Sequence, residues 1–196
     1  MTSNSNVSKD LIIVTPCSRP ENLQKLYDSI NFDKITLWLI IYDTRNLEFV
    51  KRFDNSKIVE LECKDEGVAG HQIRNMALNI IMNGLVYFLD DDNIIHPFFW
   101  NLVDHFNSGY IYTFNLLYKS GDIKFGNNPT YGNIDTSQFV FDKSLVSDLR
   151  YNANNYSSDG YFINSLVDNN KEKTMYFNYI AAYYNWLNDK QPFPIP

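Results

Sequence analysis

The sequence predicts an α/β fold whose first half is a mainly parallel, Rossmann-like half-sheet and whose second half is mixed α+β. Between residues 11 and 89, short apolar runs alternate with segments of helical periodicity. The last of these runs ends in three consecutive aspartates, Asp90, Asp91 and Asp92, and beyond them the regular alternation stops. Alternating β and α elements are typical of a parallel sheet covered by helices.

Length and composition fit one globular domain. The chain has 196 residues, of which 44% are hydrophobic and 16% aromatic, enough for a sizeable core. We expect residues 1–9 to be a flexible tail and residues 10–190 to form a single domain. Residues 191–196 contain three prolines and would be a C-terminal tail, or a linker to an additional domain or partner.

Composition also argues against several classes of protein. A net charge of −6 disfavours a general nucleic-acid binder, which normally carries a basic face. The two cysteines, Cys17 and Cys63, form no CxxC pair, so neither a disulfide framework nor a zinc site is indicated. The polar start MTSNSNVSKD lacks the apolar core of a signal peptide, and no apolar run is long enough to cross a bilayer. We therefore expect a cytoplasmic protein with no transmembrane segment.

The first predicted unit is a strand, a loop and a helix. Residues 11–14 are rich in β-branched side chains, which favours a buried strand. Ser18-Arg19-Pro20-Glu21 has the form of a helix capping box with proline in the first turn. The apolar stripe that follows at helical spacing consists of Leu23, Leu26, Tyr27 and Ile30.

Two more strands and a second helix come next. Residues 37–42 form an apolar run that ends at Asp43, and residues 58–61 form a shorter one that ends near Glu62. The spacing predicts a helix over residues 71–82, closed by Asn83 and Gly84. Its apolar stripe consists of Ile73, Met76, Ala77, Ile80 and Ile81.

A fourth strand, residues 85–89, leads into the three aspartates. Its run Leu-Val-Tyr-Phe-Leu is apolar throughout, as in a strand covered on both faces. The aspartates therefore lie at the carboxyl end of a strand, the edge where open α/β sheets bind ligands. Mg²⁺ or Mn²⁺ would relieve their mutual repulsion and bridge to phosphate oxygens, so we predict a metal site that clamps a diphosphate. The alternative is a solvated acidic turn in which Asp92 or Asn93 caps the next segment.

The second half is predicted less sharply. Residues 97–106 have a helical pattern, and residues 110–118 and 138–141 are strand-like segments separated by a Gly- and Asn-rich stretch. Residues 159–167 predict another helix. The aromatic-rich residues 175–187 fit a helix or a strand, and we expect them to pack against the sheet.

Taken in order, these pieces resemble the glycosyltransferases of the GT-A fold, in particular the small, single-domain, family-2-like type. The resemblance extends from Leu11 to about Val167. It is carried by LIIVTPCSRPENLQKLYDSI at residues 11–30, by Asp43, by the Arg74-Asn75 helix that precedes the aspartates, and by Ser158-Asp159-Gly160-Tyr161-Phe162. It implies an enzyme that transfers a sugar from a nucleotide-diphosphate donor, UDP-linked, to a glycan or other hydroxyl acceptor.

The resemblance and the chemistry together give each candidate residue a role. A diphosphate leaving group needs its negative charge neutralised, and an acceptor hydroxyl needs a base. We expect the nucleotide donor to be bound by Thr15, Pro16, Arg19, Asp43, Arg74, Asp90 and Asp91, and Mn²⁺ or Mg²⁺ to be bound by Asp90 and Asp92. We expect the acceptor to be bound by Asp135, Gln138 and Trp100. Asp159 would be the general base of an inverting reaction.

Most of these side chains also have a structural alternative. Arg74 would form a salt bridge to the aspartates, and Arg19 would only decorate a helix terminus. Asp43, Asp135 and Gln138 would serve turns, Asp159 would cap its helix, and Trp100 would lie in the core.

One departure from the resemblance concerns the metal. Many metal-dependent members of the fold use a late histidine as a further ligand, but no histidine follows His105 here. Either water and diphosphate would then complete the coordination, or metal binding would be weak. Two other functions stay open at this point: a nucleotide-sugar binding module without turnover, and a Mg²⁺-dependent phosphotransferase or nucleotidyltransferase. The absence of a glycine-rich phosphate loop disfavours the latter.

Overall fold

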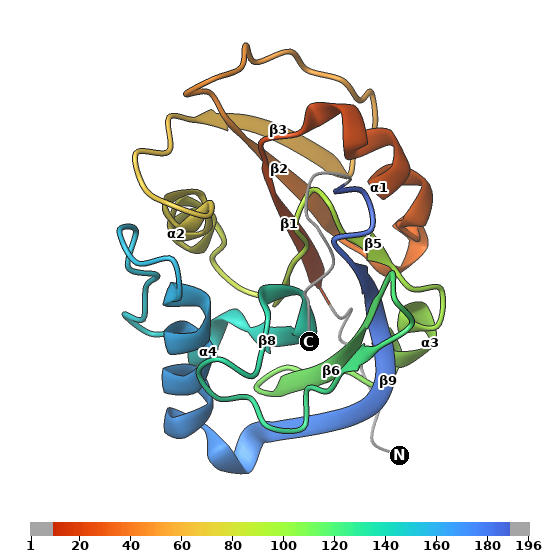
Figure 1. The fold of residues 1–196 in the computed structure, drawn as a ribbon, viewed down its shortest axis with the longest axis vertical. Helices are drawn as coiled ribbons and strands as arrows, with labels where there is room; N and C mark the ends of the chain where they lie inside the picture. Colours follow the sequence, from red (N-terminus) through yellow and green to blue (C-terminus); the bar gives the residue numbers. More distant parts are fainter. Residues whose placement is uncertain (1–9, 189–196) are drawn as a thin grey trace, which may run out of the picture.

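Four parallel strands form the first half of the sheet. The structure, a computed structural model, describes residues 10–188. In it β1 (Leu11–Cys17), β2 (Leu37–Asp43), β3 (Ile58–Cys63) and β4 (Leu85–Phe88) lie in the order β3-β2-β1-β4 (Figure 1). Because β1 has β2 on one side and β4 on the other, the strand order reverses beside β1. A crevice at the carboxyl ends of such strands is the usual ligand site of an open α/β sheet.

The second half continues the same sheet with mixed strand directions. β8 (Phe139–Asp142) lies antiparallel to both β4 and β6 (Ile111–Tyr118), and β6 lies parallel to the long β9 (Thr174–Tyr184). Two short strands, β5 (Ile94–Ile95) and β7 (Ile123–Lys124), pair with β9 and β6. Within residues 10–188 all nine strands therefore belong to one sheet. The predicted fold class, a parallel half that continues into a mixed half, is confirmed.

Helices cover both faces of this sheet. α1 (Leu23–Ser29) and α3 (Phe99–Val103) pack in one hydrophobic cluster, and α2 (His71–Ile80) and α4 (Ser158–Asn169) in another. Alternate residues of the parallel strands β1 to β4 supply the two clusters. Of the neighbours Tyr87 and Phe88 in β4, for example, the first packs with α3 and the second with α2 and α4. The continuous apolar run that predicted β4 is explained by this double cover.

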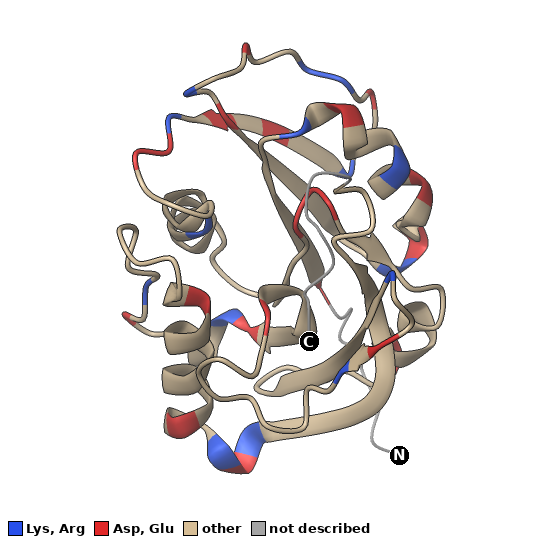
Figure 2. Cartoon of the chain, viewed as in Figure 1, with Lys and Arg blue, Asp and Glu red and all other residues tan. Residues whose placement is uncertain are grey.

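Short 3-10 turns connect several of these elements, at Pro20–Asn22, Phe32–Lys34, Thr136–Gln138, Lys143–Leu145 and Lys171–Lys173. Lys and Arg are spread among several helices, strands and loops of residues 10–188 and alternate with Asp and Glu (Figure 2). No helix within those residues is long and apolar enough to cross a membrane. The predicted tails, residues 1–9 and 191–196, lie outside the described residues.

The predicted capping box after β1 is wrong. The strand runs on to Cys17, a 3-10 turn at Pro20–Asn22 follows, and α1 begins only at Leu23. No side chain caps either helical segment, because Ser18 instead donates hydrogen bonds to Asp91. Pro16 fits inside β1 because β4 ends opposite Val14, so at Pro16 the strand has a neighbour on one side only.

The second predicted helix ends earlier than expected and buries a different face. α2 stops at Ile80, and Ile81 is already extended, so Asn83 and Gly84 do not close it. Its buried residues are His71, Ile73, Arg74, Ala77 and Leu78. Ile80, placed in the predicted stripe, is 45% exposed. The face turned toward the sheet thus includes Arg74 and His71, which an apolar stripe cannot reveal.

Several boundaries in the second half also differ from the prediction. The helix expected at residues 97–106 is limited to α3, and Gln138 belongs to a 3-10 turn that precedes β8. The segment predicted as helix or strand is the strand β9, which ends at Tyr184. β9 pairs with β6, more than 60 residues earlier, so its pattern reflects a distant partner.

Gly84 provides a test of the backbone geometry between α2 and β4. Its φ is +101°, and an added Cβ would lie 2.7 Å from the carbonyl oxygen of Asp10. Gly109 also has a positive φ, +80°, but a Cβ there meets nothing within 4 Å. We expect Gly84→Ala to lower the free energy of unfolding by roughly 3 kcal/mol and Gly109→Ala by about 1 kcal/mol, measured by chemical denaturation. Equal losses would show that β4 does not pass so close to the start of β1.

Candidate active site

A pocket of about 600 Å³ opens at the carboxyl edge of the parallel half-sheet. Its walls come from the ends of β1, β2 and β4, from the N-termini of α2 and α4, from the segment before β8 and from the segment after β9. Among the predicted site residues, those that line it are Pro16, Arg19, Asp43, Arg74, Asp90, Asp91, Asp92, Asp135 and Asp159. Thr15, Trp100 and Gln138 are not part of its lining.

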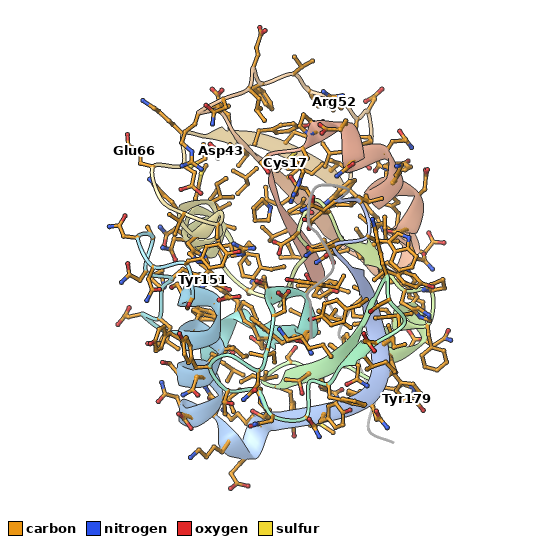
Figure 3. All side chains as sticks on the ribbon, in the orientation of Figure 1. Cys17, Asp43, Arg52, Glu66, Tyr151 and Tyr179 are labelled. Carbon is orange, nitrogen blue, oxygen red and sulfur yellow. The ribbon has the colours of Figure 1, made fainter. Side chains whose placement is uncertain are left out.

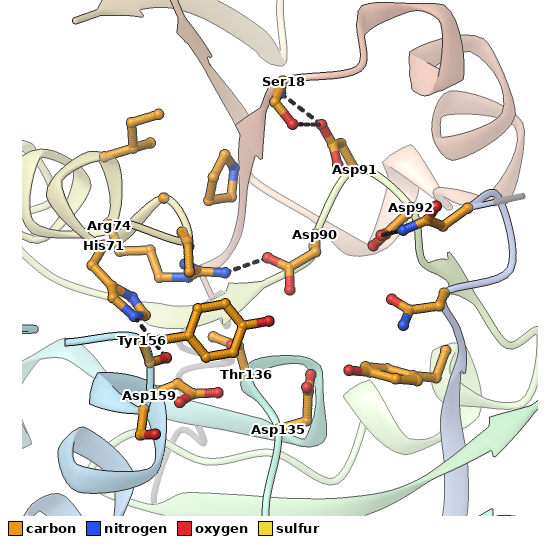
Figure 4. A pocket seen from close by; sticks show the side chains of 18 of the residues that line it. Ser18, His71, Arg74, Asp90, Asp91, Asp92, Asp135, Thr136, Tyr156 and Asp159 are labelled. Atoms are coloured by element: carbon orange, nitrogen blue, oxygen red, sulfur yellow. Dashed lines mark hydrogen bonds and ion pairs between the residues drawn. The ribbon is translucent and has the colours of Figure 1, made fainter. Parts of the chain in front are cut away.

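The three aspartates after β4 lie in three different environments. The carboxylate of Asp91 points away from the open pocket, toward the loop after β1 (Figure 4). It accepts hydrogen bonds from the backbone N–H of Ser18 at 2.6 Å and of Arg19 at 2.7 Å, and from Arg19 Nε at 2.8 Å. Both of its oxygens are occupied by donors of the chain itself, so Asp91 fastens the β1–α1 loop to the end of β4.

Asp90 forms an ion pair with Arg74 of α2. The guanidinium of Arg74 is buried and lies 5.8 Å from the ring centre of Tyr151, which packs between α2 and α4 (Figure 3). Burial opposes the charge of Arg74, but Asp90 raises its pKa above the ordinary value. The salt bridge that the sequence offered as an alternative role for Arg74 is therefore present, and the same guanidinium lines the pocket.

Asp92 is a buried carboxylate in the pocket wall. It pairs with Arg19 Nη2 at 2.9 Å and accepts a hydrogen bond from Asn188 Nδ2 at 3.3 Å. Burial and the neighbouring charge of Asp90 raise the pKa of Asp92 to about 6, although Arg19 acts in the opposite direction. The segment after β9 covers this aspartate, since Leu187 N–H also donates to the Asp92 carbonyl at 2.9 Å.

Asp135 and Asp159 face Asp90 from the opposite wall, and the three carboxylates point into a common space (Figure 4). Burial and the charge of Asp90 raise the pKa of Asp135 to about 6. Asp159 lies in the first turn of α4, where Ser157 holds the N-cap position and makes no side-chain cap. An Asp159 oxygen accepts a hydrogen bond from the N–H of Gly160 at 2.8 Å.

Asp43 marks the far end of the pocket, at the end of β2. Its carboxylate accepts hydrogen bonds from Arg45 Nε, at 3.0 Å to each oxygen, and Arg45 also donates to the Gly67 carbonyl at 2.8 Å. Burial opposes ionisation, but the hydrogen bonds and charge of Arg45 hold the pKa of Asp43 below its ordinary value. Arg45, which follows β2 in the sequence, was not among the predicted residues.

Three predicted residues have structural roles away from the pocket. Thr15 is buried and accepts a hydrogen bond from Trp38 Nε1 at 2.9 Å. Trp100 donates to the Ser29 carbonyl at 3.0 Å and packs in the core, the alternative considered for it. Gln138 is buried, with its amide bonded to the Phe114 carbonyl at 3.1 Å and to Asp135 N–H at 2.8 Å, so it completes a turn.

Several lining residues carried no functional signal in the sequence. His71 is buried at the start of α2, where its ring stacks on Tyr151 at 5.4 Å between centroids. Tyr184 and Asn185 come from the segment predicted only to pack against the sheet, and Asn188 follows it directly. Tyr131 and Tyr156 belong to loops before β8 and α4. Isolated Tyr and Asn residues form no sequence pattern that shows which of them come together in one pocket.

The acidic residues fit a cation only in part. Within residues 10–188, no group of three or more His, Cys, Asp or Glu side chains is arranged to hold a metal ion. Asp90 and Asp92 nevertheless offer carboxylate oxygens on the same pocket wall, where burial and the charge of Asp90 raise the pKa of Asp92. Such a pair can bind Mg²⁺ or Mn²⁺ when phosphate and water oxygens fill the remaining positions.

Comparison with known proteins gives structural matches alone. No protein-family model and no curated protein matches the sequence. Among solved structures, S. aureus TarS 1-349 matches with a TM-score of 0.65 and 12% identity over 89% of this chain and 60% of that one. The glucosyl-3-phosphoglycerate synthase of Mycobacterium tuberculosis matches with a TM-score of 0.60 and 12% identity, over 89% and 71%.

These comparisons establish the fold. A third match, assigned as a glucose-1-phosphate thymidylyltransferase of Bacillus anthracis, has a TM-score of 0.52 and 13% identity over 89% of this chain and 87% of that one. TarS 1-349 has been solved with UDP and with UDP-GlcNAc, and the mycobacterial synthase with Mn²⁺, UDP and glucosyl-3-phosphoglycerate. The chain spans 60% of the length of TarS 1-349. It has the GT-A fold that the sequence resemblance predicted.

Proposed function

We propose that this chain is a glycosyltransferase that transfers a sugar from a nucleotide-diphosphate donor, UDP-linked, to a hydroxyl acceptor. The observation that carries the proposal is the arrangement of Asp90, Asp92 and Asp159 around one pocket at the carboxyl edge of a GT-A sheet. Carboxylates on one wall serve the donor, and the carboxylate on the opposite wall serves the acceptor. The complexes of TarS and of the mycobacterial synthase with UDP support the choice of nucleotide.

On the donor side, the nucleotide would extend from Asp43 to the aspartates after β4. Pro16 and Arg19 line this stretch, and Arg19 already bridges Asp91 and Asp92. A guanidinium held in this way can also contact a diphosphate oxygen, because it carries five N–H donors. Asp90 and Asp92 would hold Mn²⁺ or Mg²⁺. When bound, the cation stabilises the negative charge of the departing diphosphate.

On the acceptor side, Asp159 would act as the general base. An ionised carboxylate there can accept the proton of an acceptor hydroxyl as its oxygen attacks the anomeric carbon. With the base on one wall and the departing diphosphate on the other, the displacement would be direct and the anomeric configuration would invert. Asp135, on the same wall as Asp159, would accept a hydrogen bond from the sugar.

A nucleotidyltransferase is the second candidate. The structural match to the Bacillus anthracis protein favours it, since that protein is assigned as a glucose-1-phosphate thymidylyltransferase. Such an enzyme would release pyrophosphate from a nucleoside triphosphate, whereas a glycosyltransferase releases a nucleoside diphosphate. A binding module without turnover would release neither.

The first test is nucleotide release across UDP-, GDP- and dTDP-sugars, with and without Mn²⁺. We expect metal-dependent release of a nucleoside diphosphate from one donor, lowered about 100-fold or more by Asp92→Ala because the charge on the leaving group is then poorly neutralised. Asp168→Ala is the matched control, since Asp168 is exposed near the end of α4 and does not line the pocket. Pyrophosphate release from a nucleoside triphosphate would favour the second candidate.

The role of Asp159 is tested with the isosteric variant Asp159→Asn. Loss of the base should lower kcat by roughly 10²- to 10⁴-fold, while the Kd of UDP, measured by calorimetry, stays within about twofold. With the donor found in the first test, NMR of the product should show an inverted anomeric centre. An unchanged kcat, or retention of configuration, would remove Asp159 from this role.

A further inference from the structure

Two exposed tyrosines form a stacked pair at the rim of the pocket. The rings of Tyr131, from the loop before β8, and Tyr161, from α4, have centroids 4.4 Å apart and planes inclined by 23°. Tyr131 is 48% exposed and lines the pocket, whereas Tyr161 is 52% exposed and supports it from behind. A preformed aromatic surface at a pocket rim provides a flat contact for an apolar face of a ligand.

This pair lies beside the proposed base. A Cβ added to Gly160 would approach Tyr131 Cδ2 to 3.0 Å and Gly132 N to 3.3 Å. The ring of Tyr131 therefore rests on the backbone of the residue next to Asp159, and the missing side chain at position 160 permits the contact. A molecule stacked on Tyr131 would place its polar groups near Asp159.

The charges around the pair indicate a neutral ligand. Among the described lining residues, Arg19, Arg45 and Arg74 each pair with an aspartate of the donor side. The wall nearest the tyrosines carries two carboxylates, Asp135 and Asp159, and one ammonium group, Lys124, whose charge acts on Asp135. The wall is therefore net negative, and its carboxylates accept hydrogen bonds from hydroxyl groups but repel anions. An aromatic ring beside carboxylates matches a pyranose, which has a C–H face and hydroxyl groups at its edge.

We propose that Tyr131, supported by Tyr161, forms the acceptor subsite and that the acceptor is a neutral carbohydrate. The inference rests on the proposed glycosyltransferase function and specifies its substrate class. A pyranose ring stacks on Tyr131, and one of its hydroxyl groups reaches Asp159. The acceptor contact predicted for Trp100 is thus assigned to Tyr131, because Trp100 lies in the core.

The test compares substitutions that keep or remove the aromatic face. Tyr131→Phe keeps the ring, and Tyr131→Leu keeps apolar bulk without it. Tyr179→Leu is the matched control: Tyr179 is also 48% exposed, stacks on Phe98 with centroids 4.7 Å apart, and is not among the residues that line the pocket. With UDP present, methyl glycosides of glucose, galactose and N-acetylglucosamine are screened for binding by saturation-transfer NMR. The acceptor KM is then measured with the glycosides that bind.

We expect at least one glycoside to bind, and Tyr131→Leu to weaken its binding and raise its KM by about 3- to 10-fold. Tyr131→Phe and Tyr179→Leu should stay within twofold of the wild type, and UDP affinity should be the same in all variants. Gly160→Ala, which displaces the Tyr131 ring, should act in the same direction as Tyr131→Leu.

Two results would overturn the inference while the proposed function stands. If the enzyme turns over its donor and Tyr131→Leu leaves the acceptor KM unchanged, the Tyr131–Tyr161 pair is not the acceptor subsite. Use of an anionic acceptor such as a phosphorylated acid, with no neutral glycoside bound, would show that the acceptor class is wrong. Failure of the proposed function is a different outcome, because then neither UDP binding nor release of a nucleoside diphosphate would be detected.

Discussion

The Asp91 carboxylate holds the donor side of the pocket together. It accepts hydrogen bonds from Ser18 and Arg19 and forms an ion pair with Arg19. These contacts join the loop after β1 to the end of β4, across the position where the strand order reverses. Because Asp91 points toward that loop, its neighbours Asp90 and Asp92 are left on the pocket side. The buried carboxylate of Asp91 thus fixes the path of the loop after β1, and Arg19 neutralises its charge.

The pocket as a whole contains more acidic than basic charge. Each arginine that lines it is matched to an aspartate. Burial and the charge of Asp90 nevertheless raise the pKa of Asp92 and of Asp135. Burying such groups is costly unless opposite charge compensates them. A pocket with excess negative charge favours a ligand that carries positive charge, such as a metal-bound diphosphate, and disfavours a free anion.

The sequence was sufficient to predict the parallel half and its edge, because the apolar runs and the aspartates after β4 are local signals. It was insufficient where partners are distant. Ser18 looked like a helix cap but bonds a carboxylate 73 residues away. Gln138 and Trp100 were read as acceptor contacts because loop polarity and aromatic character do not show which way a side chain points. The roles of Asp135 and Asp159 stay predictions that the pocket geometry supports.

The segment after β9 has a consequence for how the site is assembled. Asp92 accepts a hydrogen bond from Asn188, which is 96 residues further along the chain, and β9 reaches that position only after pairing with β6. Contacts of such long sequence separation form late, because chain entropy must be lost before they can stabilise anything. A partly folded chain can therefore hold its parallel strands and its three aspartates and still have an open wall beside Asp92. The binding pocket becomes complete only when the sheet does.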